Sequence, residues 1–325
     1  MLRLLTSAAS IVALVAGSAA CGSSSHDDGA GAGGTILRVG SGGSSFVNPG
    51  TGSAGDGSQG QGGHGPALGA DVGQLTITIR DFKFYDPNDS STDPDFENVP
   101  KTDQNGNPSP TYAGPWDDPD IVDGTLGDDS KPVYKNASGT TLTTHGKDAF
   151  DKWFRDVDGT NIHVDYPLTL APDGKGNYGY DSNQSGVYLS GNSGTKEFFP
   201  IDDGTQYATA FGNQGKPHNY SFTVELHTVF TYAGGETFNF RGDDDVFVFI
   251  NKKLVINLGG IHGAEPTRDC GSTCSTCSGC VVIDSLGLTV GEQYPLDFFY
   301  AERHVTESNL RVTTTLALTT APNVN

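Results

Sequence analysis

Three consecutive aspartates, Asp243, Asp244 and Asp245, are the residues of this chain whose type and spacing point most directly to chemistry. They stand directly before an apolar run at residues 246–250, so the fold must hold three carboxylates at the start of a core strand. Two carboxylates about 4 Å apart repel each other by roughly 4 kcal/mol at an effective dielectric constant of about 20. Ca²⁺, the neighbouring Arg241 or solvent would offset this repulsion, and Ca²⁺ prefers oxygen ligands of flexible geometry. From the residues alone the triplet is a solvated turn, with a calcium site as the alternative.

Four cysteines form a second cluster, at Cys270, Cys274, Cys277 and Cys280. In a reducing compartment this spacing would suggest zinc or an iron–sulfur cluster. Behind an export signal, disulfides are the usual outcome. Spacing alone does not choose among the three possible pairings. We predict two disulfides that staple this Gly-, Ser- and Thr-rich loop.

The N-terminus predicts a signal peptide at residues 1–20, because Arg3 precedes a short apolar run at residues 11–16. That run is too short to span a membrane. Small residues then lead into Cys21, as in a bacterial lipobox, although Ser18 stands where leucine is usual. Ordinary signal cleavage is the alternative, but it would leave Cys21 as an odd exposed thiol. We therefore expect lipid on Cys21 and an exported lipoprotein of the bacterial cell envelope, at the outer membrane or cell surface.

Composition separates a tether from a folded part. Residues 21–73 are rich in glycine, serine and alanine, and such a stretch cannot bury enough apolar surface to offset its ordering entropy. We expect residues 21–73 to be a disordered tether and residues 74–325 to form one domain. The net charge of −20 argues against nucleic acid or an anionic membrane as a partner, because both would be repelled. The lipid is then the only expected membrane contact.

Short strands separated by Gly, Asn and Asp turns dominate the chain after residue 73. Residues 75–80 alternate apolar and polar side chains, which is typical of a half-buried strand. Residues 246–250 are apolar on both faces and predict a central strand, followed by a turn whose central residues need positive φ. Only residues 150–157 carry apolar side chains at helical spacing. We predict an all-β fold, an antiparallel sandwich or barrel with one short helix and long loops.

Several long motifs resemble, in the same order, the signature of the fibro-slime domain family over roughly residues 76–316. The most specific are residues 238–251, which contain the aspartate triplet, residues 258–263, and residues 298–304 with Ser308 and Asn309 behind them. Fibro-slime domains are similar to the protective-antigen-type, PA-14-like, carbohydrate-binding β-barrel. The resemblance implies that an Asp-Asp pair holds Ca²⁺, and that the ion coordinates sugar hydroxyls.

Carried onto this chain, the resemblance implies Asp243, Asp244 and Asn309 as metal ligands, with Ser308 as the alternative to Asn309. Asp245 replaces the glycine that usually follows the pair and adds a charge.

Glu302 and His304 would complete the ligand site beside the aspartates. The alternative for Glu302 is an ion pair with Arg303 at a strand end, which contributes little if it is exposed.

The chain lacks a G-x-S-x-G elbow, an H-E-x-x-H motif and a phosphate-binding loop, so we predict that it is not an enzyme. The resemblance implies a surface-tethered, Ca²⁺-dependent carbohydrate-binding protein that serves adhesion, with a polysaccharide or glycan as partner. The alternative is a structural component of extracellular slime or matrix, with protein partners and no sugar site.

Overall fold

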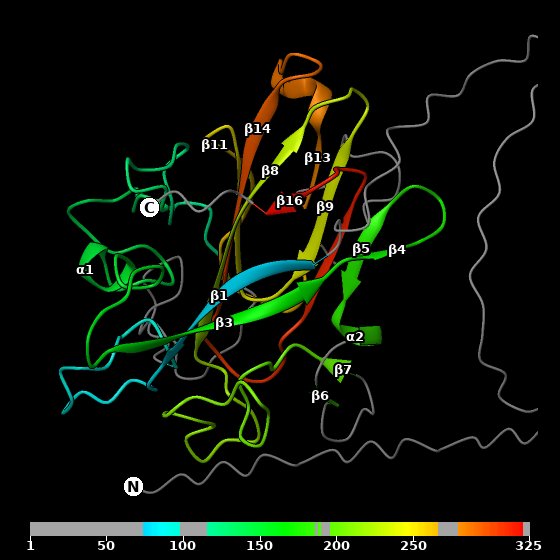
Figure 1. Cartoon of the computed structure of the whole chain (residues 1–325). Helices are drawn as coiled ribbons and strands as arrows, with labels where there is room; N and C mark the ends of the chain where they lie inside the picture. Colours follow the sequence, from blue (N-terminus) through cyan, green and yellow to red (C-terminus); the bar gives the residue numbers. More distant parts are fainter. Residues whose placement is uncertain (1–73, 98–115, 186–187, 190–195, 266–278, 321–325) are drawn as a thin grey trace, which may run out of the picture. The chain divides into compact units, whose positions relative to one another are not determined.

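The computed structural model describes residues 74–97, 116–185, 188–189, 196–265 and 279–320 (Figure 1). All of these residues belong to one compact unit, Gln61–Asn325. Several predicted features lie outside the described residues: the signal peptide, the tether, Cys21, Cys270, Cys274 and Cys277.

Two antiparallel sheets contain most of the strands of the described chain (Figure 1). The larger sheet has the order β11 (Lys253–Leu258), β10 (Asp245–Ile250), β14 (Gln293–Glu302), β8 (Phe222–Thr231), β1 (Gln74–Phe82) and β3 (Asn161–Thr169), with β16 (Thr319–Thr320) beside β8. The second sheet has the order β13 (Cys280–Val282), β9 (Thr237–Gly242), β15 (Leu310–Thr314), β5 (Tyr178–Asp181) and β4 (Ala171–Pro172).

Small elements complete the fold. They are the strand pairs β2 (Trp116–Asp117) with β12 (Gly260–Ile261) and β6 (Tyr188–Leu189) with β7 (Lys196–Glu197), the helices α1 (Lys147–Phe150) and α2 (Ser182–Ser185), and a 3₁₀ turn at Ile283–Leu286. The predicted all-β antiparallel fold is therefore confirmed. No helix of the described ranges is both long and apolar enough to cross a lipid bilayer.

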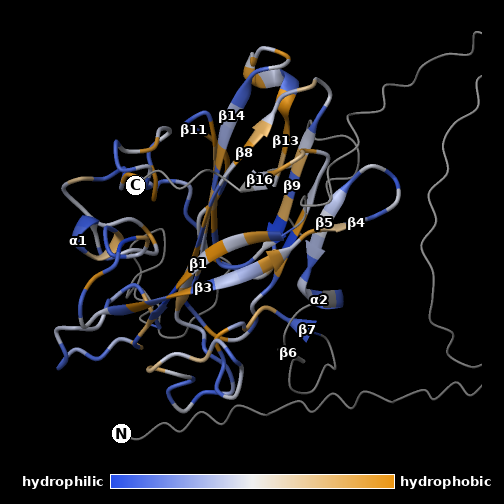
Figure 2. Ribbon diagram, in the orientation of Figure 1, coloured by the Kyte–Doolittle hydropathy of each residue, from blue (hydrophilic) through white to orange (hydrophobic). Residues whose placement is uncertain are grey.

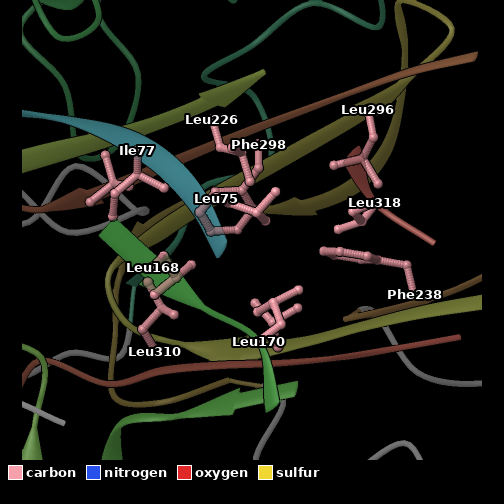
Figure 3. A pocket seen from close by; sticks show the side chains of 12 residues that line it. Leu75, Ile77, Leu168, Leu170, Leu226, Phe238, Leu296, Phe298, Leu310 and Leu318 are labelled. Carbon is pink, nitrogen blue, oxygen red and sulfur yellow. The ribbon is translucent and has the colours of Figure 1, made fainter. Parts of the chain in front are cut away.

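Apolar side chains of the two sheets meet in the main core. Many of the hydrophobic residues in Figure 2 lie on the strands of these sheets. A small apolar cavity lies within this core (Figure 3). Its lining combines side chains from both sheets, among them Leu75, Leu226 and Leu296 on one side and Phe238 and Leu310 on the other. The two sheets therefore form a sandwich that shares one apolar interior.

The outer face of the larger sheet carries a second core. Phe247 and Phe249 of β10 point to this face and pack with Trp153, Phe154 and other apolar residues of the segment that crosses it. Val246, Val248 and Ile250 of β10 point instead to the main core. All six residues of β10 are buried, because each face of this strand is covered. The predicted central strand is confirmed, and its lack of alternation follows from having two cores.

The hairpin after β10 turns through Asn251 and Lys252, whose φ angles are 51° and 66°. These values are those of a type I′ turn, in which glycine is favoured at the second position. Lys252 therefore adopts a conformation that costs about 1 kcal/mol relative to glycine.

The predicted helix at residues 150–157 is only partly correct. Helix α1 ends at Phe150, and the chain continues as turns in which Lys152 and Trp153 donate to carbonyls three residues earlier. Phe150, Trp153 and Phe154 are nevertheless buried, as their spacing indicates. Consecutive turns bring side chains three and four residues apart to one face, so the apolar pattern does not distinguish them from a longer helix.

A polar network also lies on the larger sheet. Glu225 of β8 accepts hydrogen bonds from Arg80, Lys131 and His227, and His227 also contacts Asp297 through Nδ1 at 2.6 Å. Partial burial lowers the pKa of His227, but its bonds to Asp297 and Glu225 outweigh this and raise the pKa to about 9. His227 is therefore charged at neutral pH and offsets two carboxylates that are both less than a tenth exposed.

We expect His227→Gln to destabilise the fold in a pH-dependent way. The pKa of His227 in the folded state lies above its unfolded value, so its contribution is fully present below about pH 6.5 and is lost as pH rises through about 9. The side chain is 36% exposed, and solvent screening limits the effect to about 1 kcal/mol at pH 6. Urea unfolding at pH 6 and pH 10 measures this loss, with the exposed His163→Gln as control. Equal losses at the two pH values would show that the charge of His227 has no part in stability.

Candidate functional site

Three connections meet at one end of the sandwich and bring the aspartate triplet together with the last predicted motif. Asp243 and Asp244 join β9 to β10, and residues 303–309 join β14 to β15. Ladder pairs fix the two connections side by side, since Asp245 pairs with Ala301 and Gly242 pairs with Leu310. The third connection follows β12, where the backbone N–H of His262 reaches Asp244. The Asp243–Asp244 peptide bond is cis.

Asp243 is held by Asn309. Its Oδ1 accepts a hydrogen bond from the backbone N–H of Asn309, and its Oδ2 accepts one from Asn309 Nδ2 at 3.0 Å. Asp243 is 2% exposed. Burial raises the pKa of Asp243 to about 7, although the bonds from Asn309 act in the opposite direction. Asp243 and Asn309, which the resemblance implies as ligands of one ion, are therefore in direct hydrogen-bonded contact.

Asp244 ties the other two connections together. Its Oδ1 accepts from the backbone N–H of His262 at 3.2 Å, and its Oδ2 accepts from the backbone N–H of Arg303 at 3.1 Å. Burial raises the pKa of Asp244 well above its usual range; nearby Arg303 lowers it, while Asp245 and Asp243 raise it further. The geometry of Asp244 is thus set by backbone donors on both sides.

Glu302 is fully buried beside the aspartate pair. Its Oε2 accepts a hydrogen bond from the Tyr300 hydroxyl at 2.9 Å, whereas its Oε1 has no hydrogen-bond partner among the residues that the structure describes. Burial, together with the charges of Asp244 and Asp243, raises the pKa of Glu302 well above its usual range. An unpartnered buried carboxyl oxygen is costly, so this group is short of a donor or a cation.

The predicted surface ion pair between Glu302 and Arg303 is wrong. Arg303 is also fully buried, and its guanidinium binds Asp245 through Nε at 2.6 Å and Nη2 at 3.2 Å. Successive residues of an extended chain point to opposite faces of a sheet. The side chains of Glu302 and Arg303 therefore point away from each other and do not form an ion pair. Arg303 is thereby directed away from the aspartate pair and toward the second core.

Several further contacts hold Arg303. The guanidinium donates to the carbonyl oxygens of Asp95 and Thr143 at 3.2 and 3.0 Å, and it lies 4.6 Å from the ring centre of Trp153. Asp245 completes its own bonding with the backbone N–H of Gly260 at 2.7 Å. Asp245 is therefore the structural counterion of Arg303. Sequence reasoning treated it as an added charge, whereas the register between β10 and β14 places Asp245 opposite Ala301, two residues before Arg303.

His304 lies at the edge of the site. It is half-buried, and its Nδ1 is 2.6 Å from the Val305 carbonyl oxygen. Ser308, the alternative to Asn309, is buried and bonds to Tyr300 and to the Phe198 carbonyl. The structure thus brings Asp243, Asp244, Glu302 and Asn309 together.

Cys280 is buried at the start of β13, opposite Asn239 of β9. The other three cysteines of the cluster lie outside the described residues, and disulfide formation stays a prediction.

The donor set fits calcium in its chemistry. Asp243, Asp244, Glu302 and Asn309 offer carboxylate and amide oxygens, which are the ligands that Ca²⁺ prefers. Arg303 is committed to Asp245, so the other three carboxyl groups have no comparable buried cation among their described contacts. Within the described ranges, no group of three or more His, Cys, Asp or Glu side chains is arranged so that it could hold a metal ion by itself. The candidate set therefore depends on the Asn309 amide as well as on acids.

Comparison with known proteins identifies the class. Residues 176–322 match the PA14 domain family. This match covers less than half of the chain, and it confirms the expected resemblance to the PA-14-like barrel. PA14 domains are typical of extracellular proteins that bind carbohydrate or mediate adhesion.

The chain is also similar to psi proteins of Dictyostelium discoideum. It is 41% identical to protein psiR over 200 residues, and 39% identical to protein psiD over 207 residues. Each match covers 61% of this chain but only 18% of psiR and 36% of psiD. The chain thus spans a minor part of the length of these relatives.

The expected location in a bacterial cell envelope is wrong, because these relatives are proteins of a eukaryote. The prediction depended on small residues before Cys21, and ordinary signal cleavage accepts the same residues. Ser18, in the position where a lipobox has leucine, was the sign against it.

We expect Asp245→Asn to destabilise the protein strongly, by about 3–5 kcal/mol, because it leaves the Arg303 guanidinium buried without a counterion. Urea unfolding at neutral pH measures the loss. Asp165→Asn on β3 removes the same charge at an exposed position and is expected to cost less than about 0.5 kcal/mol. A loss below 1 kcal/mol in Asp245→Asn would contradict this account of Arg303.

Proposed function

We propose that this protein is a non-catalytic, Ca²⁺-dependent carbohydrate-binding protein that serves adhesion. The observation that carries the proposal is the unpartnered Oε1 of Glu302, fully buried beside Asp243 and Asp244. Three buried carboxyl groups in one place are stable only if they are protonated or share a cation. The PA14 domain supports carbohydrate as the class of ligand.

Asp243, Asp244 and Asn309 would hold the ion, with Glu302 as the adjoining carboxyl group. A bound Ca²⁺ would supply positive charge and open coordination positions for vicinal sugar hydroxyls. The backbone donors of His262 and Arg303 keep Asp244 in place, and the backbone N–H of Asn309 does the same for Asp243. This arrangement positions the oxygens before any ligand arrives.

The same contacts support a binding role rather than catalysis. Each oxygen of Asp243 and Asp244 already accepts a hydrogen bond from Asn309, His262 or Arg303. A general base must be within hydrogen-bond reach of a substrate proton. These carboxylates are directed at the protein's own backbone and at Asn309.

A structural role in an extracellular matrix is the second candidate. It is favoured by the fact that every carboxylate oxygen of Asp243 and Asp244 already accepts a hydrogen bond. Asp243 and Asp244 are 2% and 4% exposed, and together they join three connections of the chain. A pair that only clips these connections together would need no ion. The unpartnered Glu302 oxygen is not explained by that role.

Calorimetric titration with Ca²⁺ separates the two. We expect the wild type to bind with a Kd on the order of 100 µM or tighter, within the range of extracellular calcium modules and their stronger relatives. Asp244→Asn is expected to weaken binding at least tenfold, and Asn309→Ser, which keeps the backbone donor to Asp243, is expected to weaken it as well. The exposed Asp165→Asn is the control for the loss of one negative charge.

A wild type that gives neither heat nor a thermal shift with Ca²⁺ would overturn the calcium-dependent function and leave the matrix role. Where binding is found, a glycan array with and without Ca²⁺ tests the carbohydrate class directly.

A further inference from the structure

One exposed carboxylate lies where a ligand would reach the proposed calcium site. Among the three proposed metal ligands, Asn309 is the most exposed at 9%, against 2% and 4% for Asp243 and Asp244. We take the side of Asn309 as the opening of the site, because a ligand would approach from the most exposed of the three. Glu307, two residues earlier on the same connection, is exposed at this opening.

Glu307 is linked to the site through Asn309. Its Oε2 lies 3.4 Å from Asn309 Nδ2, and the same amide group donates to Asp243 Oδ2 at 3.0 Å. The charge of Glu307 is close enough to act on Asp243, where it contributes to the raised pKa. A ligand that passes Asn309 therefore comes within a few ångströms of this carboxylate.

No basic side chain of the described ranges forms a salt bridge with Glu307. The two nearest arginines along the chain contact other acids. Arg303 is bound to Asp245, and Arg311 lies 3.7 Å from Asp181. The opening of the site thus carries a negative charge without a counterion, in a chain whose net charge is already −20.

We propose that Glu307 makes the site selective for glycans that carry a positive charge, namely amino sugars with a free amine. The inference rests on the proposed function, since the sugar is held by the ion. An amino sugar places an ammonium group next to hydroxyls on one ring, so one residue of the glycan satisfies both the ion and Glu307. Uronic acids and sulfated sugars meet repulsion at the same place.

Acetylation provides a matched pair of ligands. It removes the charge of the amine and keeps the ring and its other hydroxyls. At saturating Ca²⁺ and at a pH where the amine is charged, glucosamine oligosaccharides should bind the wild type about threefold to fivefold more tightly than N-acetylglucosamine oligosaccharides. Oligosaccharides that contain glucuronate should bind more weakly than either. The preference should decrease in 0.5 M NaCl, because salt screens exposed charges.

Glu307→Gln should abolish the preference for the free amine. Glu292→Gln is the matched control, because Glu292 is also exposed but lies before the opposite end of β14, roughly 30 Å away along the strand. This control should keep the full preference. Calcium titration of Glu307→Gln shows whether the carboxylate is instead an ion ligand.

Each other outcome has a distinct meaning. Equal affinity of the wild type for the free and acetylated sugars overturns this inference and leaves calcium-dependent binding in place. The inference is also wrong if Glu307→Gln keeps the preference, or if it weakens Ca²⁺ binding tenfold. Binding of none of these sugars, at saturating Ca²⁺, overturns both the inference and the carbohydrate-binding function.

Discussion

Burial of the Arg303 guanidinium is the constraint on which the rest of the structure depends. Removing a charged group from water costs several kcal/mol unless a counterion and enough acceptors accompany it. Asp245 supplies the counterion, the carbonyls of Asp95 and Thr143 accept further hydrogen bonds, and Trp153 covers the guanidinium face. These partners come from segments far apart in sequence, so Arg303 fixes where the loops around residues 95 and 143 lie against the larger sheet.

The same arrangement explains the surplus of acid at the end of the sandwich. The strand connections place Asp243, Asp244 and Asp245 in a row, and only Asp245 points toward Arg303. The strand after it must be apolar on both faces, because one face meets the second sheet and the other meets Trp153 and Phe154. Asp243, Asp244 and Glu302 are then enclosed without a guanidinium of their own. In the proposed site, a Ca²⁺ ion would offset the charge of these carboxyl groups, as Arg303 does for Asp245.

The sequence predicts what depends on local patterns and fails where distant partners decide. The run at residues 246–250 predicts a buried strand because its side chains have no polar face, and the turn at Asn251 and Lys252 follows from the hairpin. Motif order points to Asp243, Asp244 and Asn309 as metal ligands, which stays a prediction, and the structure shows that Asp243 and Asn309 are in contact. The role of Asp245 was missed because its partner lies 58 residues away, and the supposed pair of Glu302 with Arg303 ignored that neighbours in a strand face opposite ways. Turns after Phe150 repeat the spacing of a helix, so the apolar pattern could not mark where α1 ends.

Part of the second core lies outside the residues that match the PA14 family. The PA14 match begins at residue 176, whereas β1, β3 and Trp153 all precede it. Without them the larger sheet would lose two strands at one side, and the guanidinium of Arg303 would lose its aromatic cover. A fragment cut at the family boundary would expose the outer face of β10 and β14 to water, because the residues that cover it precede residue 176. The PA14 match is therefore shorter than the segment that supplies both cores of this domain.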